Sequence, residues 1–445
     1  MRRTTFIGLL LASTLVRVAA LPLPGTHDVP VWKIWSFAAS QAPLTVYGIG
    51  GTPPTRGVVT YGDLTTTVDY PPMAIYEMAV AGLAYRAVLP DYPNDWRLTA
   101  AVKVPGLLAG LGLTLALYCG VRRLAGDERA ARWAALAYWL NPATLLNGEV
   151  LGYLDPLVML PAVGAVLLAG LGWPALGAAA LGVALLTKPQ ALLVGPAFAL
   201  LVWRRSGWGG LVRGGTVGSA TVGLLALPYL AAGAGPNMWL AFGSWSARRD
   251  ILSGYAANLW WIVTWAVRAQ HSTAAFGFPG AFLVPVKRIL QISRFREVGY
   301  PDPRPIGRAL LALTLGGVFW KARRTRAVPV LVALSAFTIQ AFFCLSVSVH
   351  EHHMVLAVPL LALAGALHRP FRPVFWAVSA ICALNMNLFY GIGMGWGWAV
   401  PRTLTPIDLS VLLAAVNLGV LGWSARVLVR EAAIAERAPG AVAQP

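Results

Sequence analysis

Side chains that could bind a polar substrate recur at intervals along a chain that is otherwise strongly apolar. They lie in seven short stretches: Asp28, Asp69 with Tyr70, NGEVLGYLD at 147–155, TKPQ at 187–190, ARRD at 247–250 with Asn258, VHEHH at 349–353 and PRTLTPID at 401–408. A carboxylate can accept a proton from a hydroxyl group, and cationic side chains can stabilise negative charge on a departing group. An ionisable side chain costs about 2.5 to 3.5 kcal/mol at membrane depth, so a cluster of them predicts a functional site.

The composition predicts that these stretches belong to a membrane protein. Hydrophobic residues make up 57% of the 445 positions and charged residues only 12%, about half of the charged share that is usual in soluble proteins. Apolar stretches of about 20 residues, the length that a helix needs to cross a bilayer, recur from end to end. We therefore expect an all-α, polytopic integral membrane protein with a single domain over residues 1–445.

The basic residues indicate the topology. A formal net charge of +18 would suggest a nucleic-acid partner in a soluble chain. Here the charges form short clusters at alternate ends of the apolar segments, as cytoplasmic loops of membrane proteins do. The clusters are Arg2 with Arg3, the stretches 121–133, 203–213, 321–326 and 368–373, and Arg426 with Arg430. They predict that both termini are cytoplasmic and that no nucleic acid is bound.

The first apolar segment, at about 5–23, is predicted to be an uncleaved anchor, because Arg17 interrupts the apolar core that a signal peptide requires. Residues 24–99 then form an extracytoplasmic loop with an interfacial helix after Pro71 and Pro72. Further crossings are expected near 100–120, 134–148, 155–171, 174–188, 189–203, 214–232, 308–320, 327–348, 354–368, 373–391 and 406–424. A further pair within the Trp-rich stretch 233–307 would raise the total from 12 to 14.

An early acidic stretch and four motifs, in order along the chain, resemble the GT-C glycosyltransferases, specifically the endoplasmic reticulum glucosyltransferases that add glucose to the lipid-linked N-glycan precursor. HDVPVWKIW and DYPPMAIY in the first loop are similar to that family's early acidic residue and DYPPL-type motif. LNPATLLNGEVLGYLDPLVML, RRDILSGYAANLWW and SVHEHH are similar to its NP...GHFQYN, R...VANFW and HVHEK motifs. The resemblance covers most of the chain and implies a GT-C fold, with a catalytic half over 1–235 and a more variable half for lipid donor and acceptor over 236–445.

The resemblance also implies an activity. It is that of an inverting hexosyltransferase, which moves a sugar from a polyprenyl-phosphate donor to a lipid-linked or envelope glycan acceptor. His352 replaces the lysine of the family's motif, and Glu149, Tyr153 and Asp155 replace residues of GHFQYN, which leaves the sugar and the acceptor open. A bias toward Arg, Ala and Gly suggests a bacterial source. The expected location is then the cytoplasmic membrane, with the active site facing the periplasm.

Site residues follow from the same resemblance. It places the general base at Asp28 and a second carboxylate at Asp69. The residues expected to bind substrate are Tyr70, Glu149, Asp155, Lys188, Arg248, Arg249, Asn258, His350, Glu351 and His352. The donor phosphate is assigned to His350 with His352 or His353, then to Arg248, Arg249 and Lys188.

A simpler interpretation stays open for several of these residues. Asp28 could be a solvated residue beyond a helix end, and Asp69 could be a helix N-cap. Glu149, Asp155 and Lys188 could each be a solvated helix end.

No cofactor is expected, although metal ligation by Asp28 and Asp69 stays open. HEHH lacks the HExxH spacing that places two histidines on one helix face, so a zinc site is not expected. Cys119, Cys344 and Cys382 are few, odd in number and apolar in setting, which predicts no disulfide. A transporter or flippase is the alternative function. The chain lacks an internal repeat and gathers its polar stretches at one face, which favours an enzyme.

Overall fold

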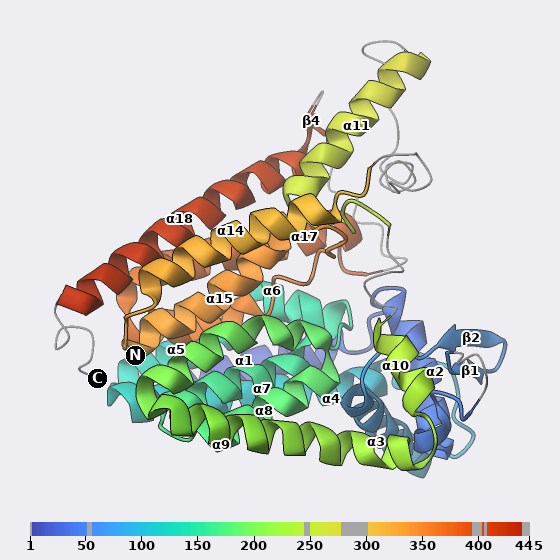
Figure 1. Ribbon diagram of the computed structural model, residues 1–445. Coiled ribbons are helices and arrows are strands. Elements are labelled where there is room, and N and C mark those ends of the chain that lie inside the picture. Colours follow the sequence, from blue (N-terminus) through green and yellow to red (C-terminus); the bar gives the residue numbers. More distant parts are fainter. Residues whose placement is uncertain are drawn as a thin grey trace. The chain divides into compact units, whose positions relative to one another are not determined.

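The structure is a computed structural model that describes residues 2–50, 56–243, 250–276, 301–393, 403–404 and 407–437. Most of these residues are helical, so the all-α prediction is confirmed (Figure 1). Within them, six helical segments are long and apolar enough to cross a membrane: Arg3–Ala20, Trp96–Ala125, Pro189–Ala231, Val328–Leu345, Arg369–Tyr390 and Leu409–Arg437. The multi-pass architecture is confirmed by these segments, whereas the total of 12 to 14 crossings stays a prediction.

The chain divides into two compact units, and the main boundary follows residue 247. The single domain expected over residues 1–445 and its division after residue 235 stay predictions. The catalytic and donor roles expected for the two halves stay predictions. Unit 1 contains α1 (Arg3–Ala20), α2 (Asp28–Gln41), η1 (Pro43–Thr45), β1 (Val58–Tyr61), β2 (Leu64–Thr67), α3 (Pro72–Val88), α4 (Trp96–Ala125), α5 (Glu128–Trp139), α6 (Pro142–Leu145), η2 (Leu146–Val150), α7 (Asp155–Gly170), α8 (Pro174–Thr187), η3 (Pro189–Val194), α9 (Gly195–Ala231) and α10 (Gly235–Gly243).

Local sequence signals set the ends of α4 and α5. The Asp95 carboxylate accepts a hydrogen bond from the Arg97 backbone N–H at 2.8 Å and so caps the start of α4. Gly126 ends this helix with a φ of 66°, a left-handed conformation that favours glycine. Asp127 then caps α5 by accepting from the Arg129 N–H at 2.8 Å. The reversal between the two helices therefore needs only two residues.

The crossing expected at 134–148 is broken, so that prediction was wrong in part. Helix α5 ends at Trp139, and α6 begins at Pro142. Proline disfavours helical backbone at the preceding residue, and the Asn141 side chain accepts instead from the Ala143 N–H at 2.9 Å. The π-helical turn η2 follows, and such turns are frequent at functional sites.

The two crossings expected at 189–203 and 214–232 appear as α9, which is interrupted at one residue. Gly207 has a φ of 63° and a ψ of −163°, so the helical path breaks there. The break lies inside the Arg-rich stretch 203–213 that was expected to connect the two segments. Residues 189–194 form the 3-10 turn η3 because the helix does not continue through Pro189.

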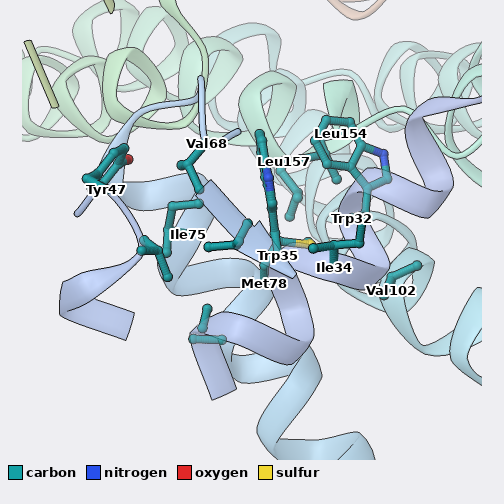
Figure 2. Packing of buried hydrophobic residues seen from close by; sticks show 14 of the residues in the cluster. Trp32, Ile34, Trp35, Tyr47, Val68, Ile75, Met78, Val102, Leu154 and Leu157 are labelled. Carbon is teal, nitrogen blue, oxygen red and sulfur yellow. The ribbon is translucent and has the colours of Figure 1, made fainter. Parts of the chain in front are cut away.

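The first loop folds into a small helical layer with its own core. The hairpin β1–β2 pairs antiparallel, with Val58 opposite Thr67, and was not foreseen from the sequence. Helix α3 begins at Pro72, as expected, while its place at a membrane interface stays a prediction. Trp32 and Trp35 of α2 are buried with Ile75 and Met78 of α3, with Leu157 of α7 and with Leu154, which directly precedes α7 (Figure 2). The layer is therefore attached to the transmembrane helices of unit 1 by aromatic packing.

Unit 2 contains α11 (Leu259–Phe276), α14 (Arg304–Ala322), α15 (Val328–Leu345), α16 (Ala357–Leu367), η5 (Arg369–Phe371), α17 (Arg372–Tyr390), β3 (Thr403–Leu404), β4 (Ile407–Asp408) and α18 (Leu409–Arg437). Helix α15 packs against α14, α16 and α18, and nearly all of its residues are buried. Figure 1 shows α15 beside α14. Cys344 and Cys382 lie buried in this unit, and Cys119 is exposed in unit 1. All three are free thiols, as predicted.

The contact between α2 and α3 yields a stability prediction. A Cβ atom added at Gly82 would lie 2.1 Å from the Ser36 carbonyl oxygen. Because backbone must move to relieve this clash, we expect Gly82→Ala to destabilise the protein by about 1 to 3 kcal/mol. Thermal unfolding of the detergent-purified protein measures the change. In the control Gly164→Ala, the new Cβ meets no atom within 4 Å, so this variant should match or exceed the parent. Equal melting of Gly82→Ala and the parent would contradict the close packing.

Candidate functional site

A buried ion pair lies at the centre of the candidate site in unit 1. The Lys188 ammonium donates to Asp155 Oδ1, and the Asn147 amide donates to Asp155 Oδ2 at 2.8 Å. Asp155 is the first residue of α7, and Lys188 lies in extended backbone between α8 and η3. Both side chains are buried, so the interpretation of these two residues as solvated helix ends is wrong.

The DYPP motif of the first loop is part of the same site. The centroid of the Tyr70 ring lies 6.0 Å from Lys188 Nζ. The centroids of the Trp32 and Trp35 rings lie 5.4 and 5.5 Å from the Tyr70 centroid. The Tyr70 carbonyl accepts a hydrogen bond from the Tyr47 hydroxyl at 2.5 Å. Burial raises the pKa of Tyr47 well above its usual value, with smaller effects from Tyr229, Tyr76 and Asp69. The hydroxyl therefore stays protonated as a donor.

Asp69 precedes Tyr70 and is only half-buried. The N-cap of α3 is Pro71, and no side chain caps that helix. The interpretation of Asp69 as an N-cap is therefore wrong, and Pro71 and Pro72 restrict the backbone that follows it.

Asp28 is joined to the same site through the turn before α7. The Thr26 N–H donates to the Leu151 carbonyl at 2.9 Å, and the Trp32 indole N–H donates to the Gly152 carbonyl at 2.8 Å. Asp28 is the first residue of α2, its side chain is 31% exposed, and Oδ1 lies 3.7 Å from His27 Nε2. Asp28 is thus held beside the 147–155 turn and stays accessible to a substrate.

Glu149 has a different setting from the other acids. Only 1% of it is exposed, and its Oε2 lies 2.5 Å from Arg17 Nη1. Arg17 also donates to the Trp139 carbonyl and to Thr144, and its guanidinium lies 4.1 Å from the centre of the Trp139 ring. The interpretation of Glu149 as a solvated helix end is wrong. Substrate binding by Glu149 stays a prediction, and its contacts are those of a residue that positions the turn.

Lys103 is a third buried cation, and the sequence reasoning missed it. Its ammonium donates to the carbonyls of Leu23, Glu149 and Val150 at 2.6, 2.9 and 3.1 Å. Gly152 has a φ of 77°, and a Cβ there would lie 2.5 Å from Val29 and 2.9 Å from Lys103. Only glycine fits this close approach. A lysine inside an apolar helix was the available signal, because such a charge requires partners.

Glu77 of α3 is another acid that the sequence reasoning did not place in the site. Its Oε1 lies 3.5 Å from Thr187 Oγ1, next to Lys188, and its Oε2 is buried without a hydrogen-bond partner among the described residues. Burial raises the pKa of Glu77 to about 8, and the Thr187 hydroxyl opposes this shift. The carboxyl is therefore largely protonated at pH 7.

The histidine motif lies in unit 2. The buried Glu351 carboxylate lies 3.0 Å from His352 Nδ1 and 3.8 Å from His350 Nδ1. The segment 348–350 pairs with 252–255, where a Cβ on Gly254 would meet the His350 ring at 2.7 Å. Tyr255 and Ser348 have φ values of 64° and 63°, and such strained backbone is often held at functional sites. The imidazole of His350 therefore has a defined position.

The other predicted residues have less direct support. The Asn258 amide donates to the Phe343 carbonyl at 3.0 Å, and its oxygen accepts from the Trp261 N–H at 2.9 Å, as in a helix cap. Asp408, in the stretch 401–408, accepts from Ser410 at the start of α18. Arg248 and Arg249 lie outside the described residues. Substrate binding by Asn258, Arg248 and Arg249 stays a prediction.

The described residues contain no group of three His, Cys, Asp or Glu side chains with an arrangement suited to a metal ion. The histidines at 350, 352 and 353 lie with ring centroids 4.5 to 6.2 Å apart, and two of them, His350 and His352, lie beside the Glu351 carboxylate. The expectation that no cofactor is required stays a prediction.

Comparison with known proteins finds similarity to solved structures but not to a known family. No protein-family model and no curated protein matches the sequence. The crystal structure of the Archaeoglobus fulgidus oligosaccharyltransferase, tethered by a disulfide bond to an acceptor peptide with an NVT sequon, is similar to this chain at 15% identity and a TM-score of 0.44. The match covers 97% of this chain and 55% of that one. This chain thus spans about half the length of that enzyme, and the likeness concerns the backbone alone.

Because Asp155 and Lys188 form an ion pair, we expect substitutions at these two positions to have coupled effects on the stability of the protein. Asp155→Asn leaves a buried ammonium without its counter-charge, and loss of one partner of a buried pair costs about 3 to 5 kcal/mol. Adding Lys188→Met should restore much of the lost stability because no charge then remains. Thermal unfolding of both single variants and the double variant tests this, with Asp63→Asn in the exposed β1–β2 turn as control. A double variant no more stable than the singles would refute the coupling.

Glu77 predicts a dependence of stability on pH. The pKa of Glu77 in the folded protein, about 8, lies above the ordinary 4.5. The stabilisation that Glu77 contributes to the folded protein is therefore complete below about pH 4.5 and is lost as pH rises through 8. The melting temperature of Glu77→Gln should therefore fall less between pH 6.5 and 9 than that of the parent. Glu436→Gln, at an exposed position of α18, should follow the parent. Identical pH profiles of Glu77→Gln and the parent would show that Glu77 is already ionised.

Proposed function

We propose that this protein is an inverting GT-C-type glycosyltransferase, which moves a sugar from a polyprenyl-phosphate donor to a lipid-linked or envelope glycan on the extracytoplasmic face of the membrane. The observation that carries the proposal is the position of the DYPP tyrosine beside Lys188, which pairs with Asp155. Segments of the first loop and of the 147–155 and 187–190 stretches thus meet in one place. These segments carry two of the motifs that resemble the GT-C glucosyltransferases.

In the proposed reaction, Asp28 is the general base. Its half-exposed carboxylate takes the proton from the acceptor hydroxyl as that oxygen attacks the anomeric carbon. The new bond joins the acceptor oxygen to the anomeric carbon, and the bond from that carbon to the phosphate oxygen breaks. The sugar inverts its configuration, and polyprenyl phosphate leaves with the bonding electrons. Asp69, the second half-exposed carboxylate, orients the acceptor.

Cationic residues stabilise the charge on the departing phosphate in this proposal. His350, with His352, and the arginines at 248 and 249 are assigned this role. Lys188 already pairs with Asp155 in a buried setting, so binding phosphate would require it to share its charge. We therefore assign Lys188 and Asp155 to holding Tyr70, and Glu149 with Arg17 to holding the adjacent turn.

A lipid-linked donor is proposed because nucleotide sugars are not present outside the cytoplasm. Such a donor keeps its tail in the bilayer and its phosphate at the interface, where the ends of membrane helices can reach it. A bacterial cytoplasmic membrane, with the site facing the periplasm, fits the alternation of arginine clusters along the chain.

The test of the function is transfer by the purified full chain. The donors compared are polyprenyl-phosphate glucose and UDP-glucose, and the acceptor is a lipid extract from cells that lack the protein. We expect labelled glycolipid with the first donor alone. Transfer from the nucleotide sugar would overturn the proposal. Movement of the labelled donor across a vesicle membrane without transfer would instead indicate a flippase.

Asp28→Asn supplies the residue-level prediction. The amide keeps the shape of the side chain but cannot accept the proton, so turnover should fall roughly 10² to 10⁴-fold while donor binding changes little. The matched control is Asp63→Asn, an exposed acid of the same loop. Near-normal turnover of Asp28→Asn together with loss in Asp69→Asn would reverse the two roles. Full activity of both variants would show that the assigned site is wrong.

A further inference from the structure

A cavity of about 450 Å³ lies among α1, α4 and α5 of unit 1. One part of its wall is apolar and consists of Phe6, Ile7, Leu10, Leu115 and Ala135. The other part carries the guanidinium groups of Arg3, Arg122 and Arg132 together with the Glu128 carboxylate. The cavity thus combines an apolar and a cationic surface, as the binding site of an amphiphilic anion requires.

Hydrogen bonds order the cationic part of the wall. Glu128 Oε1 accepts from Arg132 Nε at 3.1 Å and from the Tyr118 hydroxyl at 2.5 Å, and Glu128 Oε2 lies 3.6 Å from Arg122 Nε. Phe6 stacks on Tyr118 with ring centroids 5.7 Å apart. Three guanidinium groups against one carboxylate leave two positive charges. The carboxylate therefore orients two arginines without cancelling the attraction for an anion.

The cavity lies where a lipid headgroup would meet the chain. Helix α1 begins there, α4 ends there and α5 begins there, at the level of the arginine clusters that predict the cytoplasmic side. Ile7 and Leu115 are 43% and 56% exposed, so these apolar side chains face outward at the level of membrane-spanning helices. An acyl chain could lie along them while its headgroup reaches the arginines.

The cavity is separate from the candidate transfer site. Lys103, which holds the 149–150 turn, lies in the same helix as Tyr118. Fifteen residues of α-helix separate the two along α4, a distance of about 22 Å. Neither Asp28, Asp69 nor Lys188 lines the cavity.

We infer that this cavity binds the phosphate headgroup of an anionic glycerophospholipid from the cytoplasmic leaflet, with Arg3, Arg122 and Arg132 as its phosphate ligands. Arginine binds phosphate oxygens through paired N–H groups. Basic pockets between membrane helices on the cytoplasmic side are suited to such headgroups. The bound lipid would link α1 to the α4–α5 turn. This inference is independent of the proposed transfer reaction.

The test is binding of defined lipids to the detergent-purified full chain. Thermal unfolding is followed in mixed micelles that contain dioleoylphosphatidylglycerol, dioleoylphosphatidylcholine or, as a third arm, inorganic phosphate without added lipid. We expect saturable stabilisation by phosphatidylglycerol alone. Removal of one arginine, as in Arg122→Gln, should weaken the apparent affinity about fivefold. Equal stabilisation by phosphatidylcholine, or by phosphate, would overturn the assignment.

Two further variants separate binding in the cavity from general attraction to a basic surface. Leu115→Trp fills the apolar part without changing any charge and should abolish the saturable effect. Leu108→Trp, also exposed on α4 but outside the cavity, should bind as the parent does. If Leu115→Trp fails to fold, Arg3→Glu at the exposed start of α1 decides the question through charge reversal. If the folded variant, Leu115→Trp or its replacement Arg3→Glu, binds phosphatidylglycerol as the parent does, the proposed site is refuted.

Discussion

The requirement to neutralise buried charge shapes unit 1 more than any other single constraint. Ionised groups are costly away from water unless they are paired, and the unit meets this cost in four ways. Arg17 pairs with Glu149, and Lys188 pairs with Asp155. Lys103 donates to three carbonyls. Burial raises the pKa of Glu77 to about 8, so this carboxyl avoids a buried charge by keeping its proton. The first three solutions converge on residues 147–155. That turn connects the broken α5–α6 segment to α7, so its position is specified by charges from α1, α4 and the end of α8.

A turn held in this way can serve as a fixed support for the first loop. Its carbonyls at 151 and 152 accept from Thr26 and Trp32, and its acid at 155 holds the lysine that faces Tyr70. The two half-exposed carboxylates, Asp28 and Asp69, are thus attached to a framework of fully buried polar groups. Glu149 and Asp155 are already engaged in buried ion pairs, which suits them to positioning, whereas a carboxylate that a substrate can reach is available to accept a proton. This difference is the physical basis for the catalytic roles proposed for Asp28 and Asp69.

Unit 2 also contains a buried acid with nearby polar partners. Glu351 is buried between two imidazoles, and the backbone around His350 is held by a short pairing with residues 252–255. The positive φ values at Tyr255 and Ser348 are retained because the surrounding contacts over-determine this turn. A histidine with fixed orientation and partial exposure can bind an anionic oxygen, which agrees with the role proposed for His350.

The sequence alone determined the helical class, most segment bounds and the stretches that carry polar residues. Apolar length, proline, capping residues and arginine clusters are local signals, and the ends of α7, α8 and α15 fall within three residues of their expected positions. Helix α4 extends four residues further than expected at its start and five at its end. It could not reveal which polar residues pair, because most pairs join different helices across long stretches of chain, 33 residues for Asp155 with Lys188 and 132 for Arg17 with Glu149. Lys103 and Glu77 were overlooked for this reason, and the break after Trp139 was hidden within an apolar run. Only the tertiary structure decided which acids are buried supports and which remain accessible, since burial depends on the elements packed around each side chain rather than on its neighbours in the chain.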